Sequence, residues 1–446
     1  MFRKPARLKM RLVPLIAATY FMVSGGPYGI EDILGGAGFL RAIVLLLVLP
    51  LIWSLPAALM IGELAAAIPA EGGFYVWVRR AMGPFWGYQE SWLSLSASIF
   101  DMALYPALFV LYLGKFNPAL GQGWTGYAGS LAVVALCCLW NLRGAPEVGE
   151  DSVWMGVLLL APFAVFVVLG LWRGFTLHPA VVWGRPASDE ALSTAFLVAL
   201  WNYMGWDNAS TIAREVEDPQ RTYPRAMIAA TALTTISYVL PLAAMAFAGL
   251  SADSFSTGDW TTAARTVGGP LLAVAVIAGG CITGVGMFNA LVMSYTRLPM
   301  AMAEDGMLPR ALALRNRRGV PWLSVLLCGV AWALALKLPF ERLISIDLIL
   351  YGSSLMLEFV ALVVLRIREP HLPRPFKAGN LGFACLLGAG PAVLIGYALY
   401  ICRGEKVIGS LSALVFAAGV SLAGPLFYWL TTLAAARRPV DDPAIE

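Results

Sequence analysis

Long apolar stretches separated by short polar connectors dominate the chain. Runs such as 43–49 and 153–171 show no alternation of apolar and polar positions, so they indicate helices surrounded by lipid and not the strands of a β-barrel. Because about 20 apolar residues cross a bilayer, the pattern predicts about twelve spans. Their expected ranges are 12–36, 41–67, 84–114, 126–140, 152–172, 190–213, 225–250, 267–297, 321–337, 342–365, 381–401 and 407–434.

Composition supports this pattern and excludes other classes. Of the 446 residues, 59% are hydrophobic and only 13% are charged, whereas a soluble domain carries about 25% charged residues. Disorder is excluded as well, because disordered chains have low hydrophobicity. The sequence therefore predicts an all-α integral membrane protein.

The distribution of Lys and Arg predicts the orientation. If the N-terminus is cytoplasmic, 22 of the 31 Lys and Arg residues fall on the cytoplasmic side and nine outside. This asymmetry is the one that the positive-inside rule describes. We therefore expect a multi-pass protein of the cell membrane, with its N- and C-termini in the cytoplasm.

Two of the expected spans are interrupted by helix-breaking residues. Span one contains Ser24-Gly25-Gly26-Pro27, and span six contains Met204-Gly205-Trp206-Asp207-Asn208. Glycine and proline weaken a helix, and unwound backbone is tolerated in a membrane only where it lines a cavity. A simple kink at each place is the plainer alternative. Breaks in the first span of two successive five-span sets match the inverted-repeat pattern of transporters.

This pattern predicts a 5+5 inverted-repeat (LeuT-like) fold with discontinuous helices 1 and 6. We expect one transmembrane transporter domain over residues 1–446, with helices 1–10 forming the core over 12–367 and helices 11–12 over 381–434. A half-helix starting at Pro27 would present free amides to a carboxylate, and carbonyls near Tyr203 would accept from an ammonium group. The predicted substrate-binding residues are Ser24, Gly25, Gly26, Gly29, Glu31, Trp201, Tyr203, Trp206 and Asp207.

Several segments resemble a known family. They are 23–32 (VSGGPYGIED), 62–64 with 70–78 (GEL and AEGGFYVWV), 101–106 (DMALYP), 201–207 with 215–219 (WNYMGWD and EVEDP), and 294–298 with 303–309 (SYTRL and AEDGMLP). Together they resemble the amino acid–polyamine–organocation (APC) superfamily, and within it the plant polyamine-uptake, L-type-like branch. The resemblance implies the 5+5 fold and proton-coupled uptake of amines or amino acids.

Carboxylates inside spans are costly and are therefore candidates for function. Asp101 is central in span three and shares a polar stripe with Ser94, Ser98 and Tyr105; Asp347, Tyr351, Ser354 and Glu358 repeat this spacing in span ten. Bonding between helices is the plainer interpretation of the neutral members. Span five carries no lysine, unlike several bacterial relatives, so Asp101 is the predicted proton-coupling residue, with pairing to a substrate ammonium as the alternative. Glu63 and Glu90 lie nearer span ends, where we expect solvated or paired carboxylates.

Other classes of function lack their signatures. The chain has no HExxH, GxSxG, CxxC or GxxxxGK[ST] motif and no histidine in any span. We therefore expect no enzyme, cofactor or metal site, no nucleic acid and no obligatory protein partner. The expected partners are an amino acid or polyamine, a proton and the lipid bilayer. A facilitative amino-acid exchanger, a channel-like protein and a sensor on the same fold remain alternatives.

Overall fold

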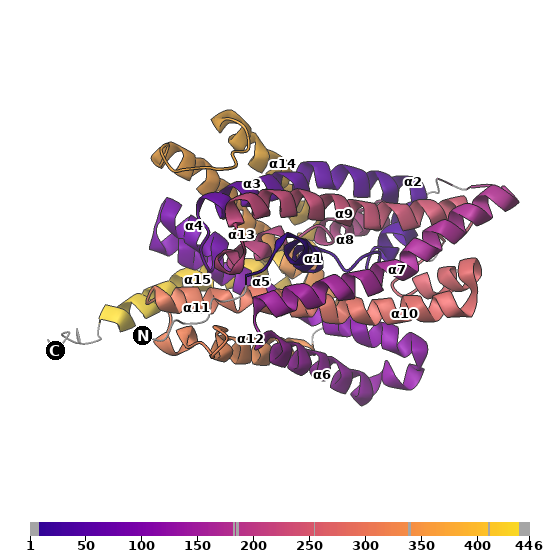
Figure 1. Cartoon of the computed structure of the whole chain (residues 1–446), viewed down its shortest axis with the longest axis horizontal. Helices are drawn as coiled ribbons and strands as arrows, with labels where there is room; N and C mark the ends of the chain where they lie inside the picture. The colour runs from indigo at the N-terminus through magenta and orange to yellow at the C-terminus, as the bar shows by residue number, and fades with distance from the viewer. Residues whose placement is uncertain are drawn as a thin grey trace.

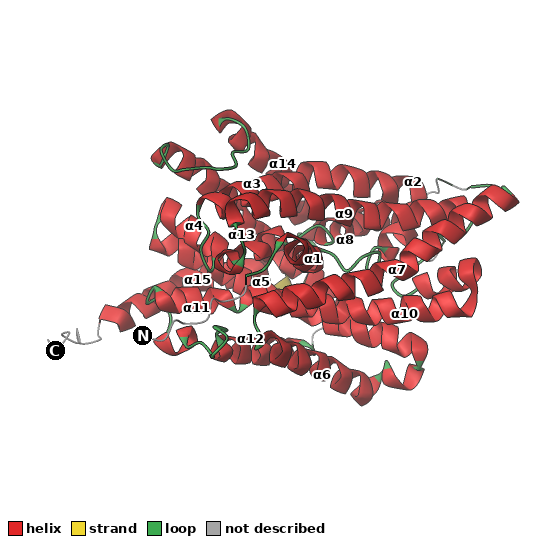
Figure 2. Ribbon diagram, viewed as in Figure 1, coloured by secondary structure: helices red, strands yellow, loops and turns green. Residues whose placement is uncertain are grey.

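The computed structural model describes residues 9–181, 183, 187–253, 255–337, 340–408 and 411–436. Nearly all of this structure is helical (Figure 2). The helices in chain order are α1 (Leu12–Val23), α2 (Glu31–Leu49), η1 (Pro50–Ser54), α3 (Leu55–Ala67), α4 (Gly73–Met82), α5 (Pro84–Phe116), η2 (Pro118–Leu120), α6 (Gly123–Asn141), α7 (Ala145–Leu177), α8 (Asp189–Trp201), η3 (Trp206–Thr211), η4 (Ala213–Glu215), α9 (Pro219–Phe247), α10 (Trp260–Tyr295), α11 (Arg297–Glu304), η5 (Arg310–Ala313), α12 (Trp322–Ala335), α13 (Phe340–Arg368), α14 (Leu381–Cys402) and α15 (Ala413–Ala436). Strands β1 (Lys406–Ile408) and β2 (Leu411–Ser412) form a short antiparallel pair before α15.

Nine helical stretches of the described residues are long and apolar enough to cross a membrane: Glu31–Ala67, Pro84–Phe116, Gly123–Asn141, Ala145–Leu177, Pro219–Phe247, Trp260–Glu304, Ile344–Arg368, Leu381–Cys402 and Ala413–Leu433. Helices α1 and α12 are shorter and also apolar. Many large apolar side chains on the long helices are exposed, for example Leu271 at 83% and Val393 at 71%. Such a surface is unfavourable in water and matches lipid, so the chain is a multi-pass membrane protein.

The backbone is non-helical at both places where glycines predict a break. Helix α1 ends at Val23, and the next helix begins only at Glu31, after left-handed φ angles of 72° at Gly26 and 89° at Gly29. These angles are easily adopted only by glycine. The expectation of a helix start at Pro27 is wrong, because the left-handed Gly29 that follows it postpones helical geometry to Glu31.

The second break also differs in detail from the expected one. Helix α8 ends at Trp201, Gly205 has a φ of 94°, and the chain continues as the 3-10 helix η3. Side chains of this segment bond to backbone: the Thr211 hydroxyl donates to the Asn208 carbonyl at 2.9 Å, and the Ser210 hydroxyl accepts from the Phe74 amide at 3.3 Å. Such bonds compete with α-helical ones, so no long α-helix resumes before α9.

The two breaks lie at the centre of the bundle. Helix α1 packs against α7, α9 and α10 and occupies the middle of the molecule in Figure 1. The long helix α5 packs on both α10 and α13, and η3 contacts both α1 and α10. At the left end of Figure 1 lie α4, α11 and the end of α15. The irregular backbone is therefore enclosed by helices, as the membrane environment requires.

Candidate functional site

A cavity lies where the two helix breaks meet α5, α10 and α13. Its volume is about 40 Å³, which is room for about three water molecules at ~10–15 Å³ each. The residues that line it come from both breaks and from six helices: Met22, Val23, Gly25, Tyr28, Gly29, Asp32, Asp101, Leu104, Tyr105, Leu108, Val198, Trp201, Asn202, Met204, Gly205, Thr257, Met287, Tyr295, Ile344, Asp347 and Tyr351. In this conformation the side chains fill most of the space, so a larger ligand requires them to move.

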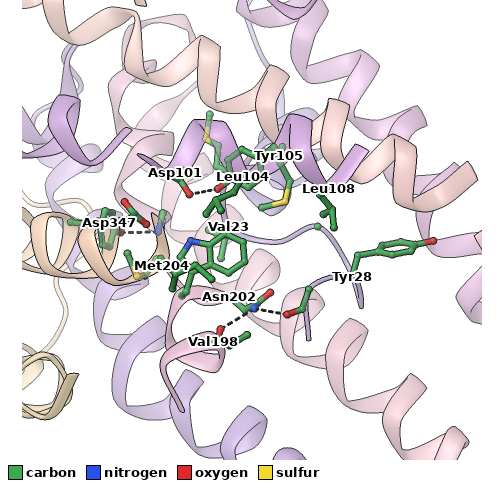
Figure 3. Close-up of a pocket in the computed structure, with 18 of the residues that line it drawn as sticks. Val23, Tyr28, Asp101, Leu104, Tyr105, Leu108, Val198, Asn202, Met204 and Asp347 are labelled. Atoms are coloured by element: carbon green, nitrogen blue, oxygen red, sulfur yellow. Dashed lines mark hydrogen bonds between the residues drawn. The ribbon is translucent and has the colours of Figure 1, made fainter. Parts of the chain in front are cut away.

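Three carboxylates line this cavity. Asp101 of α5 accepts a hydrogen bond of 2.6 Å from the Tyr105 hydroxyl. Trp201 of α8 and Asp347 of α13 line the cavity with it. Figure 3 shows these two carboxylates at one end of the pocket and Tyr28 at the other. Asp32 is held by Thr257, whose amide and hydroxyl donate to its two oxygens at 3.2 and 2.7 Å.

The other lining groups are aromatic or apolar, and none of the described lining residues is Lys, Arg or His. The rings of Tyr105 and Trp201 stack with their centroids 6.4 Å apart and their planes 19° apart. Aromatic faces attract cations, and carboxylates pair with them. The lining is therefore complementary to a positively charged ligand with an apolar body.

Glu31 binds one amide of the first break, that of Gly29. One of its carboxylate oxygens accepts from the Gly29 amide at 2.6 Å, and the other accepts from the Tyr112 hydroxyl at 2.6 Å and the Gly258 amide at 3.1 Å. Both oxygens thus have hydrogen-bond partners within the protein. Part of the anion position expected for a substrate is thus taken by the protein itself.

Carbonyl groups at the end of α1 are left without their helical donors. The Gly26 amide donates to the Ser24 hydroxyl at 3.1 Å, and Pro27 has no amide hydrogen. The carbonyls of Met22 and Val23 therefore lose their i+4 partners, and both residues line the cavity. A protonated amine supplies N–H donors of the kind that these carbonyls lack.

The structure brings only some of the predicted site residues to the cavity. Gly25, Gly29, Trp201 and Asp101 line it, whereas Ser24, Gly26, Glu31, Tyr203, Trp206 and Asp207 do not. The Tyr203 hydroxyl donates to the Leu46 carbonyl at 2.7 Å, and its ring contacts that of Tyr238. Trp206 is fully buried. Asp207 lies behind Tyr351, whose hydroxyl donates to its carboxylate.

The prediction omitted several lining residues from the substrate site. Asp32 follows the first break in sequence, and Asp347 and Tyr351 share the polar stripe of span ten, so a signal existed for these three. No local signal marked Thr257, which belongs to a connector, and Tyr295 at the end of α10 lies in the resembling segment 294–298 without having been assigned to the site. Their place in the site depends on contacts between distant segments.

Glu63 and Glu90, the two glutamates expected near span ends, have different surroundings in the structure. Glu63 is buried and paired with Arg366, and Arg374 lies 3.3 Å from its carboxylate. Glu90 is equally buried, but its carboxylate accepts only from the Ser94 and Ser91 hydroxyls, at 2.8 and 3.3 Å, among the described residues. The expectation that Glu90 is solvated or ion-paired is therefore wrong, since α5 carries it into the bundle interior.

Comparisons with known proteins identify the class. A family model described as "Amino acid permease" matches residues 16–435. The chain is 36% identical over 416 residues to the polyamine transporter PUT1 of Oryza sativa subsp. japonica, covering 90% of this chain and 76% of that protein. It is 35% identical over 412 residues to the polyamine transporter RMV1 of Arabidopsis thaliana, with coverages of 91% and 83%. It is 28% identical over 393 residues to the serine/threonine exchanger SteT of Bacillus subtilis (strain 168), with coverages of 84% and 86%.

The chain belongs to the amino acid permease family of the APC superfamily. It is a membrane transporter of small molecules and not an enzyme, which confirms the class that the broken helices and the resembling segments predicted.

Proposed function

We propose that the protein takes up cationic amines that lack a carboxylate, such as polyamines, and that a proton gradient drives this uptake. The observation that carries the proposal is that an acid of the protein already lies at the first break: Glu31 binds the Gly29 amide there, together with the Tyr112 hydroxyl and the Gly258 amide, so an amino-acid carboxylate would meet a carboxylate. The cavity beyond it presents three carboxylates and no basic side chain among its described lining residues. Two relatives at 35–36% identity named as polyamine transporters support the same substrate class.

Each part of such an amine has a complementary group. We assign one ammonium to the end of the cavity with Asp101 and Asp347, beside the Trp201 ring. A second ammonium fits Asp32 at the first break, with carbonyls of α1 as further acceptors. The apolar stem between them packs on Leu104 and Leu108. In this proposal Asp101 binds substrate and is not the coupling residue, because it lines the cavity directly.

The number of membrane crossings and the inverted repeat are part of the same proposal. We infer twelve crossings, with the inverted-repeat core over 12–367 and two further helices over 381–434. The support is that the breaks fall in the first helix of each half, after Val23 and after Trp201. Family membership is consistent with this arrangement.

The end of the molecule where α4 and α11 lie, at the left of Figure 1, carries connectors that the Lys and Arg count assigns to the cytoplasm. Ion pairs join them: Arg79 to Asp305 at 2.7 Å and Arg80 to Glu369 at 2.6 Å. Connectors that are cytoplasmic together must lie on one side, so these contacts support the proposed orientation. We accordingly propose a cell-membrane location with both termini cytoplasmic.

A matched pair of ligands tests the substrate class. Ornithine is putrescine with one added carboxylate, and lysine is related to cadaverine in the same way. We expect each diamine to displace labelled putrescine from purified protein at least about tenfold more strongly than its amino acid, because the added carboxylate meets that of Glu31. Equal displacement by ornithine and putrescine would contradict the proposal and favour amino-acid exchange.

A further inference from the structure

A group of buried carboxylates lies behind the substrate cavity and has no part in binding the amine. Glu358 of α13 is fully buried, and neither of its carboxylate oxygens has a hydrogen-bond donor among the described residues. Asp207 of η3 and Glu90 of α5 are the neighbours that act on it electrostatically. Leaving such a group charged and without a donor in the interior of a membrane protein is costly.

Tyr351, whose hydroxyl donates to Asp207, lies seven residues before Glu358 and therefore on the same face of α13, so this face brings the two acids together. Two ionised carboxylates offer only acceptors and repel each other in such a place. One proton between them changes one partner into a donor and satisfies the contact. No Lys or Arg forms an ion pair with Asp207, Glu358 or Glu90 in the part of the chain that the structure describes, so a proton is the cation that the geometry accommodates.

The remaining groups around the pair are neutral hydroxyls and two further acids, Glu90 and, from the cavity, Asp347, both of which interact electrostatically with Asp207. The Tyr351 hydroxyl of α13 donates a hydrogen bond to Asp207, and Tyr295 of α10 lies close enough to Asp207 to interact with it electrostatically. On α5, Glu90 is bound by Ser91 and Ser94. From α4, Tyr75 faces Glu90, and its hydroxyl donates to Asp305 at 2.8 Å.

Tyr351 connects this pair to the substrate cavity. Its side chain lines the cavity, its hydroxyl donates to Asp207, and the same oxygen accepts from the Gly205 amide at 2.8 Å. Gly205 is the left-handed residue of the second break. A change of charge at Asp207 therefore acts, through one side chain, on the backbone that forms the cavity.

The spacing of acids along two helices separates Glu90 and Glu358 from the cavity. Glu90 precedes Asp101 by eleven residues on α5, and Glu358 follows Asp347 by eleven on α13. At 1.5 Å per residue each interval is about 16 Å. The helices run antiparallel and pack together, so the acids form two layers, one at the cavity and one toward the end that carries the α4 arginines.

We propose that Asp207 and Glu358 hold the transported proton between their carboxyl groups, with Glu90 as the adjoining carboxylate and Tyr351 as the contact to the cavity. The proposal rests on the proton-driven uptake proposed above and moves the coupling site away from Asp101. With the proton bound, the pair carries one negative charge and its contact is stable. When the proton leaves toward the cytoplasm, two charges are left in contact, and their repulsion favours a different arrangement of the second break.

Glu358→Gln tests this assignment in proteoliposomes, since glutamine keeps a donor toward Asp207 but cannot release a proton. We expect the variant to bind putrescine within about threefold of wild type and to exchange it across the membrane. Accumulation driven by a pH gradient should fall at least about tenfold, to the level seen with a protonophore. Glu150→Gln, at an exposed glutamate of α7, is the matched control and should accumulate normally.

Wild-type accumulation by Glu358→Gln would overturn the proposal, and so would loss of binding and exchange in a folded variant. If Glu358→Gln does not fold, infrared difference spectra between acidic and alkaline buffer provide a second test. The wild type should show a protonated carboxyl band, and Asp207→Asn should remove it. An unchanged band in Asp207→Asn would overturn the proposal equally. Failure of the proposed function is distinguishable, because the wild type itself would then not accumulate putrescine.

Discussion

Replacing Asp101 by Asn separates substrate binding from proton coupling at that residue. The change removes one negative charge from the cavity and keeps the shape of the side chain and an oxygen for the Tyr105 hydroxyl, which donates to it at 2.6 Å. The bundle should therefore fold normally. What is lost is the attraction between the carboxylate and a substrate ammonium.

The magnitude follows from the surroundings of Asp101. Its side chain is 6% exposed, so water screens the contact little. At ~4 Å and an effective dielectric constant of about 20, the gross Coulomb energy is about 4 kcal/mol. Desolvation of both partners offsets part of it, and hydrogen bonds to charged groups contribute a net ~1.5–3 kcal/mol. We therefore expect the Kd for putrescine to rise about 10- to 150-fold.

Equilibrium binding of labelled putrescine to detergent-purified protein measures this effect. Asp189→Asn, at an exposed position in the first turn of α8, is the control and should bind like wild type. A Kd for Asp101→Asn within about twofold of wild type, together with lost accumulation against a gradient, would refute the reasoning and make Asp101 the coupling residue.

Three further predictions concern packing, a buried ion pair and a surface one. In Gly25→Ala the new Cβ would lie 2.2 Å from a side-chain carbon of α10, so we expect uptake to be lost with ~1–3 kcal/mol of strain, whereas Gly396→Ala, with open space around it, should transport normally. Glu63→Gln leaves two buried arginines without their anion, and a thermal-shift assay should show ~3–5 kcal/mol of lost stability. Arg80 lowers the pKa of Glu369 below its ordinary value of 4.5. The ion pair therefore stabilises the folded protein above that pH, and this stabilisation disappears as the pH falls through the lowered pKa. Arg80→Ala should remove at most ~1 kcal/mol of stability. A melting-temperature difference between Arg80→Ala and wild type that is constant with pH would contradict this last prediction.

The sequence alone predicts those structural features that depend on a few neighbouring residues. The glycines and proline of 24–29 predict that a spanning helix is interrupted, because glycine adopts left-handed φ angles and proline lacks an amide hydrogen. The i, i+4 spacing of Asp101 and Tyr105 likewise predicts that both belong to one polar stripe, since residues four apart lie on one helix face. Both features are present in the structure.

The sequence did not indicate which groups of the protein bind at the helix break. Glu31 takes part of the anion position with the help of Tyr112 and Gly258, which lie 81 and 227 residues away in the chain. No local pattern predicts such contacts. For the same reason Glu90 seemed to lie near a span end, whereas packing of α5 against α13 places it inside the bundle.

Uptake of labelled putrescine into proteoliposomes under an imposed pH gradient tests the central claim most directly. With the outside acidic and no sodium present, we expect accumulation above the external concentration and its collapse on addition of a protonophore. Uptake that only equilibrates, that requires sodium, or that occurs only in exchange for an internal amino acid would contradict the account.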